Sequence, residues 1–394
     1  MLTKFKPVSS SKKKRSIIIL LIIVVALIIW QVIYSKSFNS VQITKSPSDN
    51  KAYIPEVEQQ KPQGKLISPQ KTTASNPQAN IKKSHIESLG TFDCLENILS
   101  FGDEITEDYQ QSVDEFLKSG DPLYYALFGP TSEEKSRFDL LYDYNKIYPN
   151  NPLVSNDLIN NCSESNNKCT PEFIEELIQA DANNGAAWVN VVSFYASKNN
   201  DEKVLDSINA LEKTAYYNER FGERALLYAQ ALEGSPSNNF SVNAVAGIGI
   251  GVSHLFSFTS VSEWCQSNIS ISLRAQACLT FGEQLETRSQ TAISYAYGLA
   301  IQSTIYTKTN NTKAQKIIKS KEQNHTESLR NEAFQTVGLM MILDERLMRR
   351  YLNSIDSEGE IGSQELLIEE AEKLYEENDN YLCTLMNEAL GSIL

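Results

Sequence analysis

One stretch near the start of the chain is apolar enough to constrain everything that follows it. From Ile17 to Tyr34 only Gln31 is polar. Because an α-helix rises about 1.5 Å per residue, about 20 such residues span the ~30 Å hydrocarbon core of a bilayer. Trp30 and Tyr34 lie where aromatic rings favour the membrane interface. The sequence therefore predicts one transmembrane helix over residues 16–34.

Basic residues set the orientation of this helix. Six lysines and arginines precede it within residues 1–15, whereas only Lys36 and Lys45 follow it closely. Since Lys and Arg beside a span stay in the cytoplasm, we expect residues 1–15 to form a basic cytoplasmic tail. The rest of the chain is then periplasmic or extracellular, and the predicted location is the inner (cytoplasmic) membrane, crossed in a single pass.

A cleaved signal peptide is the alternative interpretation. Such a peptide carries an apolar stretch of about 7–15 residues followed by a site of small residues. Here the apolar run is longer and stays bulky to its end, and only Ser35 and Ser37 offer weak cleavage candidates. We therefore favour an uncleaved signal anchor, although the sequence alone leaves cleavage open.

Charge divides the chain into two unlike parts. Of its 36 Lys and Arg and 49 Asp and Glu, residues 1–85 hold 14 and 3, which gives that part a net charge of +11 and the remainder −24. A basic segment beside a membrane is suited to anionic lipid, and an acidic domain is suited to water. The acidic remainder argues against nucleic acid as a partner, because phosphate binding needs a basic surface.

Residues 35–85 are rich in Ser, Lys, Gln, Pro and Asn and contain few large apolar side chains. Such a composition cannot bury enough surface to offset the entropy of ordering, so we interpret this stretch as a disordered linker. The folded extracytoplasmic domain is expected over residues 86–394, where apolar residues recur with the helical period and no strand pattern is convincing. The predicted fold class is all-α.

Several helix boundaries follow from local signals. Thr131-Ser-Glu-Glu134 matches a capping box that would open a helix through Tyr148, and Thr170-Pro171 supplies an N-cap followed by proline. Asp201 is expected to cap the next helix. Further helices are expected over residues 219–233, 241–258, 270–306, 324–352, 363–378 and 380–393.

A short motif recurs between helices. Pro149-Asn-Asn-Pro152 reappears 33 positions later as Ala182-Asn-Asn-Gly185, and Asn218 follows Asn184 by 34 positions. A period of 34 residues is typical of tetratricopeptide repeats, which are helix pairs stacked into a solenoid. The residues that fall where the pattern of that family would put them are Asp181, Asn184, Ala187, Trp188, Tyr195 and Asp201.

Residues 131–233 thus resemble tetratricopeptide-like repeats, with two departures. Val192 and Val204 stand where the family has small residues, which predicts altered packing between the paired helices. The resemblance implies a helix-pair solenoid, or an irregular helical array, that binds a protein or peptide on a concave surface. No groove residue can be carried over, because the matched positions are packing positions. Residues 241–394 show no repeat and form the C-terminal helical part. The general layout looks similar to uncharacterised bacterial membrane-anchored proteins, and this similarity does not indicate any particular activity.

Six cysteines lie beyond the anchor, all on the predicted oxidising side of the membrane, where disulfides persist. Cys162 and Cys169 bracket a polar loop, and Cys265 and Cys278 can pair if the chain turns between them. Cys94 and Cys383 would then join the two ends of the domain. These three pairs are a hypothesis among 15 possible connectivities. A zinc site or a redox dithiol is less favoured, because Cys-x2-Cys is absent and His85, His254 and His325 are scattered.

Other candidate patterns carry little chemistry. Gly247-x-Gly249-x-Gly251 has no preceding strand and lacks the last Gly of a dinucleotide fingerprint, so it indicates close helix packing. His254, with Glu263 and Glu283 not far off, is an acid–base candidate, but a lone His on an apolar helix is typical of a core residue. Asp356-x-Glu358-x-Glu360 lacks the Gly and the closing Glu of a calcium loop.

Adjacent acids, such as Glu133/Glu134, Glu175/Glu176 and Glu369/Glu370, point in different helical directions and indicate solvated faces. We predict no catalytic, cofactor-binding or metal-binding residue, and no cofactor. The favoured function is a membrane-tethered extracytoplasmic binding or scaffold protein with a protein or peptide partner. The alternative is an extracytoplasmic enzyme, of the kind that hydrolyses cell-wall polymer, with a site assembled from distant helices.

The predicted topology can be tested directly. A reporter enzyme that is active only outside the cytoplasm is fused after residue 85 in the full-length anchor and linker. The excess of basic residues before the span predicts an active fusion. An inactive fusion, made at normal levels, would overturn the orientation.

Overall fold

The computed structural model describes residues 107–162, 167–235, 239–253, 258–267, 272–330, 332–377, 381 and 384–385. The tail, the transmembrane helix and the linker predicted for residues 1–85 lie outside these ranges, as do Cys94, Cys383 and His254. No helix in the part of the chain that the structure describes combines the length and the apolar character needed to cross a bilayer.

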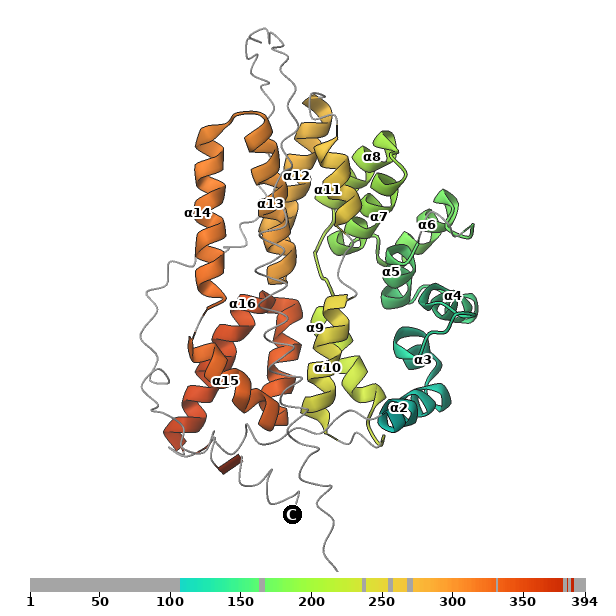
Figure 1. Cartoon of the computed structure of the whole chain (residues 1–394), viewed down its shortest axis with the longest axis vertical. Helices are drawn as coiled ribbons and strands as arrows, with labels where there is room; N and C mark the ends of the chain where they lie inside the picture. Colours follow the sequence, from blue (N-terminus) through green and yellow to red (C-terminus); the bar gives the residue numbers. More distant parts are fainter. Residues whose placement is uncertain are drawn as a thin grey trace, which may run out of the picture. The chain divides into compact units, whose positions relative to one another are not determined.

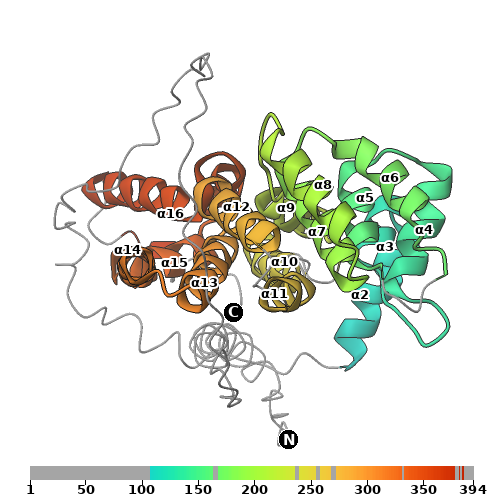
Figure 2. The same cartoon turned by 90° about the horizontal axis from the view of Figure 1, so that it is seen from above.

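The described part of the chain is all-α, as predicted, apart from one isolated bridge between Asn184 and Tyr216 (Figures 1 and 2). Its helices, in chain order, are α2 (Glu107–Ser119), α3 (Pro122–Phe128), α4 (Arg137–Ile147), α5 (Pro152–Asn160), α6 (Pro171–Ile178), the 3-10 turn η3 (Gln179–Asp181), α7 (Gly185–Ser197), α8 (Asp201–Glu212), α9 (Phe221–Ala231), α10 (Phe240–Ser253), α11 (Thr259–Gln266), α12 (Ser272–Arg288), α13 (Ala292–Lys308), α14 (Thr312–Ser328), α15 (Glu332–Leu343) and α16 (Glu345–Glu377).

Side-chain caps determine where many of these helices begin. The Thr170 hydroxyl accepts the N–H of Phe173 and Pro171 follows at the first helical position, as the sequence predicts. Asn151 and Asn184, the two asparagines of the recurring motif, cap α5 and α7 in the same way. The first two copies of the repeat are therefore helix N-caps, whereas Asn218 precedes α9 without capping it.

Two predicted caps are wrong. Thr131–Glu134 opens no helix, because Ser132 closes a turn with Lys135; α4 starts five residues later, from a capping box made by Ser136 and Asp139. Asp201 does not cap α8 either. Asn200 accepts the N–H of Lys203 and takes the N-cap position.

Asp201 instead joins α8 to the helices that follow it in space. Its carboxylate accepts two hydrogen bonds from the Arg274 guanidinium, at 2.6 and 2.5 Å, and one from the Trp264 indole N–H at 2.9 Å. Hydrogen bonds between a carboxylate and a guanidinium are charge-assisted, so Asp201 stabilises the fold more in this tertiary contact than it would as an exposed helix cap.

The longest predicted helices are divided in the structure. The stretch 270–306 is two helices, because Ser289, Gln290 and Thr291 leave the helix and Thr291 caps α13. The stretch 324–352 covers the end of α14, all of α15 and the start of α16. The helix predicted for 363–378 is the second half of α16, which bends at Gly359, where φ is +75°. Most of 380–393 lies outside the described residues.

Helix pairs form a row that is interrupted once. Hairpins α5/α6 and α7/α8 are neighbours, and α11 and α12 then pack on α7 and α8, so they occupy the next place in the row. The pair α9/α10, which comes before them in the chain, leaves the row and packs on α16, α15 and α3 (Figure 1). The two valines that depart from the family pattern, Val192 and Val204, are fully buried.

Two disulfides join neighbouring helices. Cys162 and Cys169 are bonded across the loop between α5 and α6, with Cα atoms 5.6 Å apart. Cys265 of α11 and Cys278 of α12 are bonded with Cα atoms 5.8 Å apart. These are the two local pairs suggested by the sequence, while the third pair, Cys94–Cys383, lies outside the described residues.

Glycines let α10 approach α9 closely, but only on one side. A Cβ at Gly247 would lie 2.6 Å from the backbone oxygen of Ala225, and one at Gly251 would lie 3.1 Å from the ring of Phe221. A Cβ at Gly249, between them, would meet nothing within 4 Å. The packing role predicted for this glycine run therefore holds for Gly247 and Gly251 and not for Gly249.

These two kinds of glycine predict opposite effects on one helix. Gly247→Ala should lower the free energy of unfolding by about 1–3 kcal/mol, because α9 and α10 must separate. Gly249→Ala should raise it by about 0.5–1 kcal/mol, because alanine is the better helix former and has room. Urea unfolding of the full chain in detergent, followed by circular dichroism, measures both; a loss of equal size in the two variants would contradict the packing described here.

Candidate functional site

A groove lies over helices α6, α7 and α8. It encloses a cavity of about 300 Å³. Three side chains spaced i, i+3 and i+7 on α7 line it, namely Trp188, Val191 and Tyr195, which places them on one face of the helix. The other walls are apolar residues of α6 and polar residues of α8, among them Ile174, Ile178, Lys203 and Ser207.

Trp188 is held in place by the turn before α7. Its indole N–H donates to the backbone oxygen of Ala182 at 2.8 Å, and the ring stays partly exposed at the groove. Because the N–H is already satisfied, the ring presents apolar surface without an unmet polar group. Trp188 can therefore cover an apolar side chain from another molecule.

Tyr195 brings an unmet hydrogen-bonding group to the same groove. Its side chain is only 3% exposed, and its hydroxyl has no hydrogen-bond partner among the described residues. Burial raises the pKa of this phenol, and the nearby carboxylates of Glu175 and Glu172 raise it further against the opposing charge of Lys203. The hydroxyl thus stays protonated as a donor, and leaving a buried polar group unpaired costs about 1–3 kcal/mol.

One ion pair crosses the groove between α6 and α8. The Lys203 ammonium lies 2.7 Å from a carboxylate oxygen of Glu175, with both side chains about half exposed, at 42% and 58%. Such an exposed pair contributes little to stability. The groove is therefore bordered by charges that can exchange partners at small cost.

The sequence predicted only part of this site. The repeat pattern predicts Trp188 and Tyr195 as packing residues, whereas the structure places both in the groove wall. The sequence predicts Glu175 as part of a solvated face and does not predict its ion pair with Lys203. A stripe at i, i+3 and i+7 has the same period whether it faces a core or a cavity, so periodicity could not separate the two.

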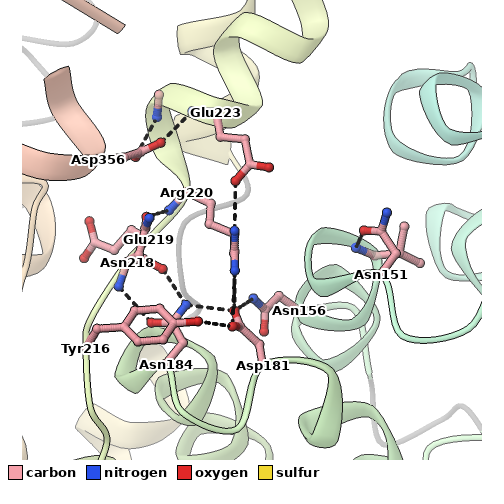
Figure 3. Close-up of polar contacts among 12 residues, drawn as sticks. Asn151, Asn156, Asp181, Asn184, Tyr216, Asn218, Glu219, Arg220, Glu223 and Asp356 are labelled. Atoms are coloured by element: carbon pink, nitrogen blue, oxygen red, sulfur yellow. Dashed lines mark hydrogen bonds and ion pairs between the residues drawn. The ribbon is translucent and has the colours of Figure 1, made fainter. Parts of the chain in front are cut away.

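A second polar cluster, around Asn184, fixes the start of α7 (Figure 3). The Asn184 amide donates to Asp181 and to the backbone oxygen of Asn218, both at 2.8 Å. Its oxygen accepts the N–H of Ala186 at 3.1 Å and that of Asn218 at 2.8 Å. This fully buried amide uses two donors and two acceptor positions, which is its whole capacity.

Asp181 extends the cluster toward α9. Its carboxylate accepts from the Tyr216 hydroxyl at 2.7 Å and from the Arg220 guanidinium at 3.2 Å, as Figure 3 shows. Burial alone would raise the pKa of Asp181, but the hydrogen bonds from Arg220, Asn184 and Tyr216 outweigh burial and hold that pKa below its usual range. The carboxylate is therefore a charged partner for Arg220 throughout the neutral range.

The N-terminus of α9 receives its cap from a distant helix. Arg220 stands at the N-cap position with φ of +54°, and its side chain does not cap the helix. Asp356 of α16 instead accepts the N–H groups of Gly222 at 3.0 Å and Glu223 at 2.7 Å. A buried ion pair beside it, Arg224 with Asp157 of α5, has two bonds of 2.7 Å.

Glu219 is the acid in this region that most resembles a catalytic group. Burial raises its pKa to about 7, against the hydrogen bonds from Ser294, Thr291 and Tyr217 that lower it. The cavity it borders, however, measures only about 20 Å³, which is room for about one water molecule. Glu219 accepts the N–H of Thr291 at 2.9 Å, so its carboxylate serves the start of α13.

The other acids and histidines singled out from the sequence do not converge. Asp356 and Glu360 accept backbone N–H groups at the starts of α9 and α13, and His325 is buried against the backbone oxygen of Ala292. Glu263 and Glu283 are exposed on separate helices. Among the described residues no group of three or more His, Cys, Asp or Glu could hold a metal ion.

Comparison with known proteins adds no relative: no family model, no curated protein and no solved structure matches the chain. The groove over α6–α8 is large enough for a ligand side chain, whereas the polar cluster around Asn184 is filled by its own partners.

The unpaired hydroxyl of Tyr195 predicts an unusual mutational result. Tyr195→Phe should leave the free energy of unfolding unchanged or raise it by up to about 1 kcal/mol, because no hydrogen bond is lost. Tyr297→Phe is the matched control. Its ring stacks on Phe258 at 3.9 Å and its hydroxyl donates to the backbone oxygen of Phe258, so the variant should lose about 1–2 kcal/mol. Equal losses in urea unfolding would mean that Tyr195 has a structural partner.

Proposed function

We propose that the protein is a membrane-tethered, extracytoplasmic helical binding module, in which the groove over α6–α8 takes an apolar side chain of a peptide segment from a partner protein. The observation that carries this proposal is the groove itself. A cavity of about 300 Å³ is lined by Trp188, Val191 and Tyr195. Cavities of this size lie at the lower end of those that hold ligands.

The groove meets the physical needs of a binding site at low cost. Its aromatic residues stand on α7, whose start is fixed by the Asn184 cap, so little side-chain entropy is lost on binding. Filling the cavity with an apolar side chain removes water chiefly from the Trp188 ring, which is partly exposed in the free protein. A backbone carbonyl of the bound segment would also pair the Tyr195 hydroxyl, which restores a hydrogen bond that the free protein lacks.

In this proposal, the membrane anchor and the linker of the module are inferred from the sequence. The apolar stretch at residues 16–34 is the anchor, and residues 35–85 are the linker that lets the domain stand off the bilayer. Two disulfides in the described domain support an oxidising compartment, because such bonds are rare in the cytoplasm. The stacked hairpins α5/α6 and α7/α8 support a tetratricopeptide-like arrangement, which commonly presents a binding surface.

The proposal predicts saturable 1:1 binding of a simple probe, an uncharged octapeptide with a Leu-Ile-Leu core between serines. Calorimetric titration of the full chain in detergent should also give a negative heat-capacity change, the sign of apolar burial. Ser207→Phe, which places a ring in the groove, should abolish binding. Ser207 is buried and bonds a carbonyl of its own helix, and so does Ser354 on α16, away from the groove, which makes Ser354→Phe the matched control.

The outcome against the proposal is equally specific. If the Leu-Ile-Leu peptide and its charged counterparts all fail to bind, the groove is not a peptide site. If Ser207→Phe binds as well as the unmodified chain while both variants stay folded, the peptide binds elsewhere.

A further inference from the structure

We propose that the groove over α6–α8 selects a cationic segment, in which the apolar side chain that enters the cavity is flanked by Lys or Arg. This inference rests on the proposed function and adds the class of partner. Two carboxylates and one ammonium group line the groove, namely Glu175 of α6 and Asp206 and Lys203 of α8, and a third carboxylate, Glu172, lies one turn before Glu175 on α6.

The four charges do not cancel. Lys203 is bonded to Glu175 at 2.7 Å, which leaves Glu172 and Asp206 without a cation of their own in the groove. All three acids are exposed at the surface. Glu175 and Asp206 line the groove itself, and Glu172 stands one helical turn before Glu175 on α6.

The charge around the groove agrees with the charge of the two helices that form its sides. Helix α6 carries three glutamates and no basic residue, and α8 carries four acids against Lys203 alone. Residues 86–394 as a whole have a net charge of −24. The net negative charge of the domain therefore attracts a cationic segment at long range, and the carboxylates beside the groove attract it on binding. An acidic segment is repelled by both.

The buried hydroxyl of Tyr195 explains why the segment should be a peptide and not merely a cation. Tyr195 lines the groove, is 3% exposed, and has an unpaired hydroxyl among the described residues. A phenol can donate to the backbone carbonyl of a segment whose apolar side chain fills the cavity. The apolar wall, the donor and the acidic border together describe an apolar residue between basic neighbours.

The experiment compares three octapeptides with the same Leu-Ile-Leu core, flanked by Lys, Ser or Glu. Affinities for the full chain in detergent are measured at 0.05 M and 0.5 M NaCl. The Lys-flanked peptide should bind about tenfold more tightly than the Ser-flanked one at low salt, and the Glu-flanked one more weakly than either. The preference should shrink to about threefold or less at high salt, where exposed charges are screened.

Variants of the groove should move this preference in both directions. Glu175→Gln with Asp206→Asn should remove most of the preference for Lys, because two carboxylates are lost and Lys203 is freed. Lys203→Gln should instead strengthen binding of the Lys-flanked peptide several-fold, because Glu175 becomes available. A damaged fold cannot produce such a gain. Glu365→Gln with Glu369→Gln, on exposed positions of α16, is the control with the same loss of charge.

The results separate this inference from the function on which it rests. Equal binding of the Lys- and Ser-flanked peptides, or preference for Glu, would overturn the cationic partner while the binding module stands. Failure of all three peptides would overturn both. An equal change of preference in the α16 control would show that net charge acts, and not the groove.

Discussion

The side-chain amide of Asn184 is the interaction on which the described fold depends most. It caps α7 and donates to Asp181 in the preceding turn. It also donates to the backbone oxygen of Asn218 and accepts the backbone N–H of the same residue. Two of its four bonds join points of the chain that are 34 residues apart. Because the amide is fully buried, loss of any one partner would leave a polar group unsatisfied away from water. The turn before α7 and the extended segment before α9 are therefore fixed together.

This constraint has consequences on both sides of the cluster. On one side it sets the start of α7, and with it the stripe of Trp188, Val191 and Tyr195 that lines the groove. On the other side it fixes the segment before α9, and α9 does not continue the row of hairpins. Instead, α9 packs against α16 through Asp356 and against α5 through the ion pair of Arg224 and Asp157. Buried ion pairs of this kind add little net stability, but their geometry admits one arrangement of partners.

The parts of the fold that the sequence predicted are those decided by neighbouring residues. Thr170-Pro171 opens α6, Asn151 and Asn184 cap α5 and α7, and cysteines close in sequence are bonded. The errors occur where distant groups decide. The helix predicted over 270–306 is broken where Glu219 and Glu360 accept the N–H groups that start α13. The periodicity does not predict the groove, because Trp188, Val191 and Tyr195 have the spacing of core residues, and only the packing of α6 and α8 around them leaves a cavity.

Hydrogen exchange provides the most direct measurement of the central claim, that the α6–α8 groove is the binding surface. The full chain is compared with and without a saturating amount of the Lys-flanked Leu-Ile-Leu peptide, and amide exchange is followed by mass spectrometry. The account predicts slower exchange confined to Pro171–Ile178, Gly185–Ser197 and Asp201–Glu212. Protection that appears instead in α12–α16, or no protection of α6–α8 when the peptide is bound, would contradict it.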